Sequence, residues 1–125
     1  MAAGLPTEGE NSKHPRVGAV ARRDVPVCAP GDRLGSVDRT RGAAVVVDAD
    51  RVVLGLLREK ELAGDPDSTV EEAMLNGPST FRPHVPVKEV AGYMTEHDLD
   101  SAPITTSDGK LVGILFREDA VRSAS

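Results

Sequence analysis

The chain has 125 residues, of which 39% are hydrophobic and 28% are charged, and its formal net charge is −5 at pH 7. This length allows one domain, or two small fused units, with a real core. Its basic residues are dispersed and its aromatic residues are Phe81, Tyr93 and Phe116 alone. The basic surface and the stacking platforms of nucleic-acid binders are therefore missing, and we expect no nucleic-acid partner.

No stretch approaches the ~20 apolar residues that cross a bilayer, and residues 1–20 are polar where a signal peptide would be apolar. We therefore expect a cytoplasmic protein without a membrane partner. Cys28 is the single cysteine, which excludes an internal disulfide framework. Within the stretch VPVCAP it is expected to be a small buried strand residue and not a nucleophile.

Residues 1–16 mix Pro, Gly, Glu, Asn, Ser and Lys without periodicity, which is typical of a flexible lead-in. A first unit follows over residues 17–64, where short β-type runs alternate with helical segments. Its strands are expected over 25–30, 42–48 and 51–57, and its helices over 31–41 and 58–64.

The same order returns over residues 77–125, which predicts an internal repeat. The strands of this second unit are expected over 79–83, 101–107 and 110–116, and its helices over 84–100 and 117–123. Asp and Gly residues between the last two strands of each unit predict hairpin turns. Each unit therefore reads β-α-β-β-α. Because neither unit alone could close a large core, we expect the two to pack face to face.

The helix of the second unit has an apolar face, because its apolar residues stand at i, i+3, i+4 and i+7. These residues are Val87, Val90, Ala91 and Met94.

Residues 65–76 connect the units. Thr69 stands three residues before Glu72, the spacing of a capping box, and predicts a short helix that begins there. Val70, Ala73 and Met74 should form its buried side.

The first unit is shorter than the second. Pro30 and Gly55 are 25 residues apart, whereas Pro83 and Gly113, their counterparts, are 30 apart. Aligning the copies places a deletion of six residues in the first helix and an insertion of one in the first hairpin. We expect the surface built by that helix to be weaker or more mobile than its counterpart.

The repeated order, the Ala-Pro-Ile sequence at 102–104 and the spacing from Gly113 to Asp119 together resemble the cystathionine-β-synthase (CBS) domain. Pairs of this domain are called Bateman modules. The resemblance covers residues 17–123, and the second copy matches it better than the degenerate first copy. It implies an α/β (α+β) fold in which two β-α-β-β-α repeats form a pseudo-twofold pair. Such a pair encloses two clefts, each able to hold an adenosine-containing ligand.

The resemblance gives Asp119 the role of accepting hydrogen bonds from both ribose hydroxyls. This is chemically sensible, because an ionised carboxylate accepts through two oxygens and a vicinal diol offers two donors. A second interpretation of Asp119 is a simple helix N-terminal charge, which the helix dipole favours. Gly113 also has two interpretations. Its missing side chain leaves room for a ligand ring or another backbone to approach the strand, or it leaves room only for the neighbouring helix.

Phe116 departs from the family pattern, which usually has Ser or Thr at this place. Its ring can stack on adenine or fill the cleft. In the first copy Arg58 and Glu61 stand at the positions of Phe116 and Asp119. They can hold a phosphate and a diol, or they can simply begin a solvated helix.

The remaining candidate contacts with the ligand come from residues on the strands. In the family, the segment that Ala102, Pro103 and Ile104 resemble meets the adenine edge with its backbone, and Thr80 borders the same cleft. Val27 matches Thr80 in the first copy. Apolar residues at these positions also serve core packing.

No catalytic pattern is found in the sequence. The histidines His14, His84 and His97 are far apart and have no second metal ligand at a suitable spacing. The nucleophile elbow, the P-loop and the dinucleotide fingerprint are missing. The carboxylates of residues 48–50 and 97–100 are expected to be solvated turn residues and not an acid-base pair. We therefore expect no enzyme activity.

The sequence thus predicts a stand-alone regulatory module that senses an adenosine-type ligand. AMP, ADP, ATP or S-adenosylmethionine is a possible regulatory ligand, and no cofactor is required. As in the family, a homodimer is expected to form through helical faces, to which the apolar face over 87–94 or the short helix at 70–75 contributes. An unidentified effector protein would receive the signal. The alternative is a non-catalytic dimerisation or protein-interaction scaffold whose clefts are filled by its own side chains, Phe116 foremost.

Overall fold

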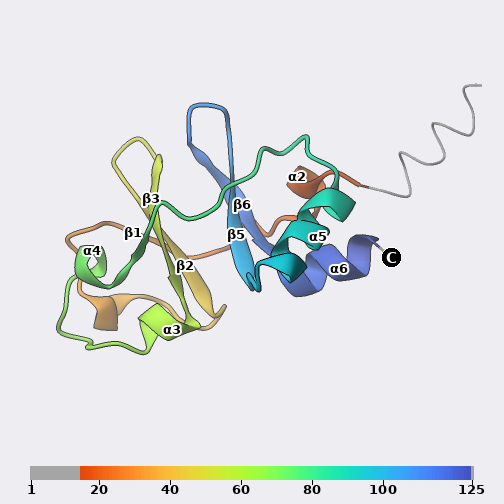
Figure 1. The fold of residues 1–125 in the computed structure, drawn as a ribbon. Coiled ribbons are helices and arrows are strands. Elements are labelled where there is room, and N and C mark those ends of the chain that lie inside the picture. The colour runs from red at the N-terminus through yellow and green to blue at the C-terminus, as the bar shows by residue number, and fades with distance from the viewer. Residues whose placement is uncertain (1–14, 125) are drawn as a thin grey trace, which may run out of the picture.

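The computed structural model describes residues 15–124, so most of the expected lead-in, residues 1–14, lies outside the described residues. The described chain forms two small sheets with short helices on either side (Figure 1). This mixed α and β content confirms the predicted fold class. Within residues 15–124, no helix is both long and apolar enough to cross a membrane.

The first half of the chain builds a four-stranded sheet in the order β1-β2-β3-β4. β1 is parallel to β2, and the other neighbours are antiparallel. The strands are β1 (Val27–Cys28), β2 (Ala43–Val47), β3 (Val53–Arg58) and β4 (Leu75–Asn76). The helices of this half are the 3-10 turn η1 (Leu34–Ser36), α3 (Glu59–Leu62) and α4 (Val70–Ala73).

The second half repeats this arrangement with fewer strand residues. β5 (Ser101–Thr105) and β6 (Leu111–Phe116) form an antiparallel hairpin. Beyond β5, Phe81 makes a parallel bridge to Ile104, and beyond β6, Arg22 makes an antiparallel bridge to Ile114. These bridges take the places of β1 and β4, so the strand expected over 79–83 is reduced to one bridging residue. The helices of this half are α2 (Val17–Val20), α5 (Val87–Glu96) and α6 (Arg117–Ala124).

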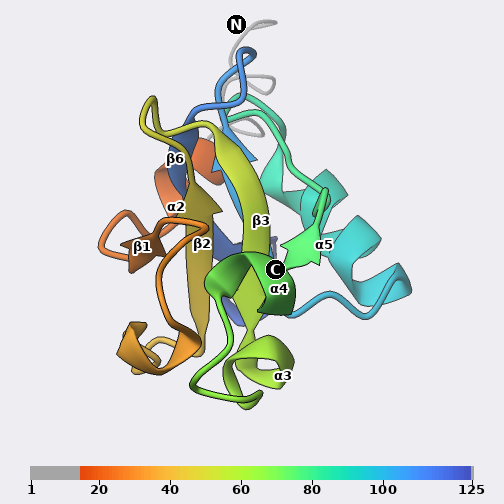
Figure 2. The same ribbon diagram turned by 90° about the vertical axis from the view of Figure 1, so that its left-hand side faces the viewer.

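The segment before each half packs on the other half. α2 and Arg22 precede the first half and pack on the second, and α4 and β4 precede the second half and pack on the first. α2 lies beside α5 and α6 at one end of the molecule, and α4 lies at the other end (Figures 1 and 2). Equivalent hydrogen bonds fasten them: the N–H of Val17 donates to the carbonyl of Val85 at 2.9 Å, and that of Val70 donates to the carbonyl of Asp32 at 2.8 Å. This reciprocal exchange supports the predicted pseudo-twofold pairing. The repeat boundaries themselves stay a prediction.

Apolar side chains form three clusters, one between the sheets and one under the helices at each end. The central cluster contains Val45, Leu56 and Ile114, which are at most 2% exposed. Strand residues from both halves meet in it, so the two sheets share one core. This packing is the face-to-face contact that the repeat predicted.

The predicted apolar face of α5 is confirmed, because Val87, Val90, Ala91 and Met94 are only 0–6% exposed. They pack inside the molecule against α2 and β5. Val70 of α4 is buried as well. The expectation that Val87, Val90, Ala91 and Met94 contribute to a dimer surface is therefore wrong, since they are used in the core. A contribution from the short helix at 70–75, in which Glu71 and Glu72 are exposed, stays a prediction.

The helix predicted over 31–41 is reduced to η1, a single turn. Leu34 and Val37 are buried as the pattern requires. Gly35 lies against Pro66, whose carbonyl accepts its N–H at 3.0 Å, and the chain leaves the helical path after Ser36. A turn this short gains few helical hydrogen bonds, so tertiary contacts must hold it. The first unit therefore lacks the outer surface that α5 gives the second.

Two local predictions are confirmed. The capping box at the start of α4 is formed: Thr69 accepts the N–H of Glu72 at 3.3 Å and donates its own N–H to Glu72 at 3.0 Å. Cys28 is a buried strand residue, and burial raises the pKa of its thiol to about 11. At neutral pH this thiol stays protonated and is a poor nucleophile.

Gly113 makes room for a neighbouring backbone. A Cβ atom on Gly113 would lie 2.5 Å from the carbonyl oxygen of Arg22, and one on Gly55 would collide with Met74 in the equivalent place. The N–H and carbonyl of Arg22 both bond to Ile114, at 2.8 and 2.9 Å. Of the interpretations given above, close approach of another backbone is the one that the structure supports.

We predict that Gly113→Ala destabilises the protein by about 1–3 kcal/mol, because the added methyl group pushes Arg22 off β6. Gly92→Ala is the matched control, since Gly92 lies in α5 with nothing within 4 Å of the added Cβ. This control should stabilise the protein by up to about 1 kcal/mol through helix propensity. Urea denaturation measures both changes. Equal stabilities for Gly113→Ala and the wild type would contradict the packing role of Gly113.

Candidate functional site

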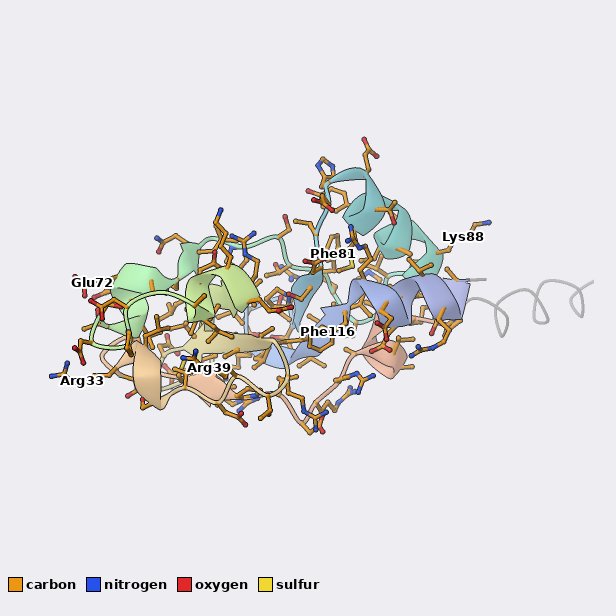
Figure 3. The ribbon with its side chains drawn as sticks, turned by 90° about the horizontal axis from the view of Figure 1, so that it is seen from below. Arg33, Arg39, Glu72, Phe81, Lys88 and Phe116 are labelled. Carbon is orange, nitrogen blue, oxygen red and sulfur yellow. The ribbon has the colours of Figure 1, made fainter. Side chains whose placement is uncertain are left out.

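A cleft of about 1010 Å³ opens between the two halves, at the end where β6 leads into α6. The first half contributes Thr40, Arg41 and Glu59, and Arg22 comes from the segment before β1. The second half contributes Thr95, Asp100, residues 116–119, Val121 and Arg122. Figure 3 views the molecule from this end, with Phe116 near its centre. The cleft therefore has walls from both repeats, as the resemblance implied.

Asp119 is a buried carboxylate of this cleft, and its side chain is only 7% exposed. It lies in the first turn of α6, where the helix dipole favours a negative charge. Arg22 donates to it twice, from Nε to Oδ2 at 2.8 Å and from Nη2 to Oδ1 at 3.2 Å. Arg122 donates to Oδ1 as well. Both carboxylate oxygens are thus held by guanidinium groups.

These contacts favour the ionised form of Asp119 and lower its pKa. The hydrogen bond from Arg22 is the main reason why the pKa of Asp119 lies below its ordinary value of 3.8, and burial opposes the shift. The same pairing raises the pKa of Arg22. At neutral pH the cleft therefore presents an acceptor-only group with two oxygens.

Phe116 lies at the cleft wall and also touches the central core cluster. The guanidinium of Arg22 lies 6.0 Å from the centre of its ring, at the outer limit of a cation–π contact. The ring is half-buried, so one part packs on the core and another lines the cleft. This position is compatible both with stacking of the ring on adenine and with filling of the cleft by the ring.

Glu61 and Arg58 form an acid–arginine pair in the first half. Arg58 donates from Nε to Oε1 at 2.8 Å and from Nη2 to Oε2 at 2.6 Å, and its N–H donates to Oε1 at 2.8 Å. The hydrogen bond from the Arg58 side chain lowers the pKa of Glu61. The two residues cap the start of α3 and are not among the lining residues of the large cleft. This geometry fits the helix-start interpretation.

The predicted strand contacts lie apart from the large cleft. Ala102, Pro103 and Ile104 are buried in β5, where the Pro103 carbonyl accepts the N–H of Phe81 at 3.2 Å. Thr80 is half-buried beside this bridge, and Val27 is 44% exposed at the edge of the first sheet. None of the five is among the residues that line the cleft. Their role in ligand contact stays a prediction.

Sequence reasoning missed the arginines around Asp119. Arg122 could have been found, because side chains three residues apart meet on a helix. Arg22 lies 97 residues away along the chain, so no local signal identifies it. Arg117 also lines the cleft and pairs with Asp98 and Asp100 at 3.1 and 2.8 Å. Lone arginines have no motif that separates them from solvated surface charges.

A smaller pocket of about 430 Å³ adjoins the cleft and shares Thr40, Arg41 and Glu59 with it. Arg39 lies on its wall (Figure 3). Within residues 15–124, no group of three or more His, Cys, Asp or Glu residues is placed to hold a metal ion. Arg39, Arg41 and Glu59 give this pocket guanidinium and carboxylate groups.

Comparison with known proteins matches the CBS domain family model to residues 70–125. The fold is similar to the CBS domains of a transcriptional regulator from Streptococcus pneumoniae, with a TM-score of 0.76, 18% identity and coverage of 86% of this chain and 97% of that chain. It is also similar to CBSX2 in complex with AMP, with a TM-score of 0.75, 21% identity and coverage of 88% and 96%. At these identities the likeness shows the fold. The resemblance predicted from the sequence is confirmed.

A curated relative is the uncharacterized protein YtoI of Bacillus subtilis strain 168, which is 29% identical over 83 residues. The match covers 66% of this chain and 19% of the relative. The chain therefore spans about a fifth of the length of this curated protein.

The pairing of Asp119 predicts a specific pH dependence. Because its folded pKa is lowered, the ionised carboxylate stabilises the protein above about pH 4, and this stabilisation is lost as the pH falls through the folded pKa. Asp119→Asn should therefore be less stable than the wild type at pH 7, and the difference should shrink towards pH 3. Urea denaturation at several pH values measures it.

Glu71→Gln is the matched control, because Glu71 is an exposed carboxylate in the first turn of α4. It should change stability little at any of these pH values. A stability difference for Asp119→Asn that stays constant from pH 7 to pH 3 would contradict the stabilising pair.

Proposed function

Because residues 70–125 belong to the CBS-domain family and the chain has the fold of paired CBS domains, we propose that it is a regulatory module for an adenosine-containing nucleotide. The ligand binds in the cleft at Asp119. A similar fold has been described with AMP in the complex of CBSX2, which supports this ligand class. The proposed role is non-catalytic.

The observation that carries the proposal is a buried, ionised carboxylate at the wall of a cleft large enough for a nucleotide. Arg22 now gives Asp119 two hydrogen bonds. The two hydroxyls of a ribose offer the same number of donors to the same two oxygens. A ribose can therefore replace the guanidinium without leaving the carboxylate unsatisfied.

When the ribose binds, Arg22 can exchange Asp119 for a phosphate of the ligand and so keep a negatively charged partner. Its side chain is 44% exposed, so it can turn from Asp119 towards a ligand phosphate without being buried alone. Guanidinium groups bind phosphate in a bidentate manner. Phe116 lines the same cleft and offers a flat face to the adenine ring.

Arg22 also gives the proposed module its regulatory output. Its backbone is bonded to Ile114 on β6, while its side chain holds Asp119. A ligand that replaces the side-chain bonds changes the forces on the segment from α2 to β1. Such a ligand shifts the protein between two arrangements only if it binds them unequally. A homodimer, an effector protein and a cytoplasmic location are the parts of this proposal that rest on the sequence predictions.

A second candidate function is a protein-interaction scaffold. It is favoured by the fact that both acids at the ligand positions, Asp119 and Glu61, are already paired with arginines of the same chain. In this function the pairs close the sites permanently, and Phe116 completes the filling of the cleft. Nucleotides would then leave the protein unchanged.

Thermal unfolding of the purified chain with AMP, ADP, ATP, NAD or S-adenosylmethionine separates these functions. A ligand at ~100 times its dissociation constant adds about 2.7 kcal/mol to the stability of the folded state and raises the unfolding temperature by several degrees. We expect one or more adenosine ligands to do so. The shift should disappear in Asp119→Ala and in the more conservative Asp119→Asn.

Glu71→Ala is the control for removal of a carboxylate from the first turn of a helix, and it should keep the full shift. If no nucleotide shifts the wild type at millimolar concentration, nucleotide sensing is wrong. A shift that appears only in Phe116→Ser would show that Phe116 closes the cleft, in agreement with the scaffold.

A further inference from the structure

We infer that Asn76 is a site of spontaneous covalent modification, at which the side-chain amide is converted to aspartate and isoaspartate. This inference goes beyond the proposed function and concerns the connection between the two halves. Asn76 is followed directly by Gly77, and it is the only asparagine within residues 15–124. Because glycine has no side chain, its backbone nitrogen is the least hindered one that can approach the preceding side chain.

The reaction needs no reagent other than water. The electrophile is the side-chain amide carbon of Asn76. The backbone nitrogen of Gly77 gives up its proton and forms a bond to this carbon, and the side-chain nitrogen leaves as ammonia. Water then opens the resulting succinimide ring at either of its carbonyl groups, which gives aspartate or isoaspartate. Overall, water is consumed and ammonia is released in equal amounts.

The structure leaves both reacting groups accessible. Asn76 and Gly77 are exposed, and nothing lies within 4 Å of the place that a Cβ atom on Gly77 would take. Within residues 15–124, neither the Asn76 side chain nor the Gly77 N–H has a hydrogen-bond partner. The attacking nitrogen therefore breaks no hydrogen bond to other described residues when it turns towards the side chain.

The strand that contains Asn76 is short. β4 has two residues, which pair with Leu56 and Gly55 at the edge of the first sheet. Attack by the Gly77 nitrogen requires rotation of the Asn76 backbone, and so short an edge strand opens at little cost in free energy. The pairing therefore slows the reaction without preventing it.

The sequence Asp108-Gly109 has the same kind of residue pair but is protected. The N–H of Gly109 donates to the carbonyl of Thr106 at 2.9 Å, and the Gly109 carbonyl accepts the N–H of Val53 at 3.0 Å. The hydroxyl of Thr106 donates to the carboxylate of Asp108. This turn is thus held from within and by the hairpin of the first half. The nitrogen that would have to attack is already used as a donor.

Conversion changes the connection between the halves in two ways. It adds a negative charge opposite Gly55, and in isoaspartate it also adds a methylene group to the main chain between α4 and the second half. The added methylene displaces the carbonyl of residue 76, so its pairing with Gly55 is disturbed. Met74, which packs against Gly55, depends on the same pairing. The modified protein should therefore unfold at a lower temperature.

Peptide mass spectrometry of the purified full chain after incubation at mildly alkaline pH tests the inference. The peptide that contains Asn76 should gain the mass that separates O from NH, and its isoaspartate form should elute apart from its aspartate form. The rate should rise in proportion to the hydroxide concentration, because the attacking nitrogen must first lose its proton. Asn76→Gln should keep its mass and its unfolding temperature, since the longer side chain closes the ring far more slowly.

Asp108→Asn is the matched control, because it creates a second asparagine-glycine sequence at a turn whose N–H is already bonded. In the folded protein the new amide should be lost about tenfold more slowly than that of Asn76, as expected where a hydrogen bond must break before the attack. In urea the two rates should become similar. Equal rates in the folded protein, or an Asn76 peptide that changes only in urea, would overturn the inference. No nucleotide is present, so this result is independent of the proposed function.

Discussion

The backbone pairing of Arg22 with Ile114 is the contact on which the rest of the molecule depends. It is possible because Gly113 has no side chain where the carbonyl of Arg22 lies. The pairing adds a neighbour to β6 and holds α2 against the second half. It also carries the Arg22 side chain to Asp119. One bare position on a strand therefore lets the segment that contains α2 join the second half and places a guanidinium group beside the carboxylate of the candidate site.

The two repeats share two structural features, but their acidic residues lie in different surroundings. Each has a glycine that admits the segment preceding the other repeat, and each has an acid held by an arginine at the start of its last helix. In the first half the acid, Glu61, serves the cap of α3. In the second half Asp119 borders the large cleft. The segment before β2 and the segment before β5 both line this cleft, through Thr40 and Arg41 in one half and through Thr95 and Asp100 in the other.

Local sequence patterns predicted an element correctly where residues within that element alone determine its structure. The apolar spacing over 87–94 became the buried face of α5, and the capping box at Thr69 became the start of α4. The prediction that this face of α5 contributes to a dimer surface was wrong, because periodicity shows that a face is buried but not what buries it. The first helix was overestimated for a similar reason: its apolar residues are buried, but tertiary contacts and not helical bonds hold them.

The sequence by itself determined the repeat, the order of its elements, the mixed α/β fold and the place of Asp119 at the start of a helix. These features depend on residues close together in the chain or on the comparison of two copies. Only the tertiary structure decided that Arg22 holds Asp119, that backbone occupies the space beside Gly113, and that Arg41 borders the cleft. The physical reason is distance along the chain. Arg22 and Asp119 are 97 residues apart, and such a pair forms only after both sheets have packed.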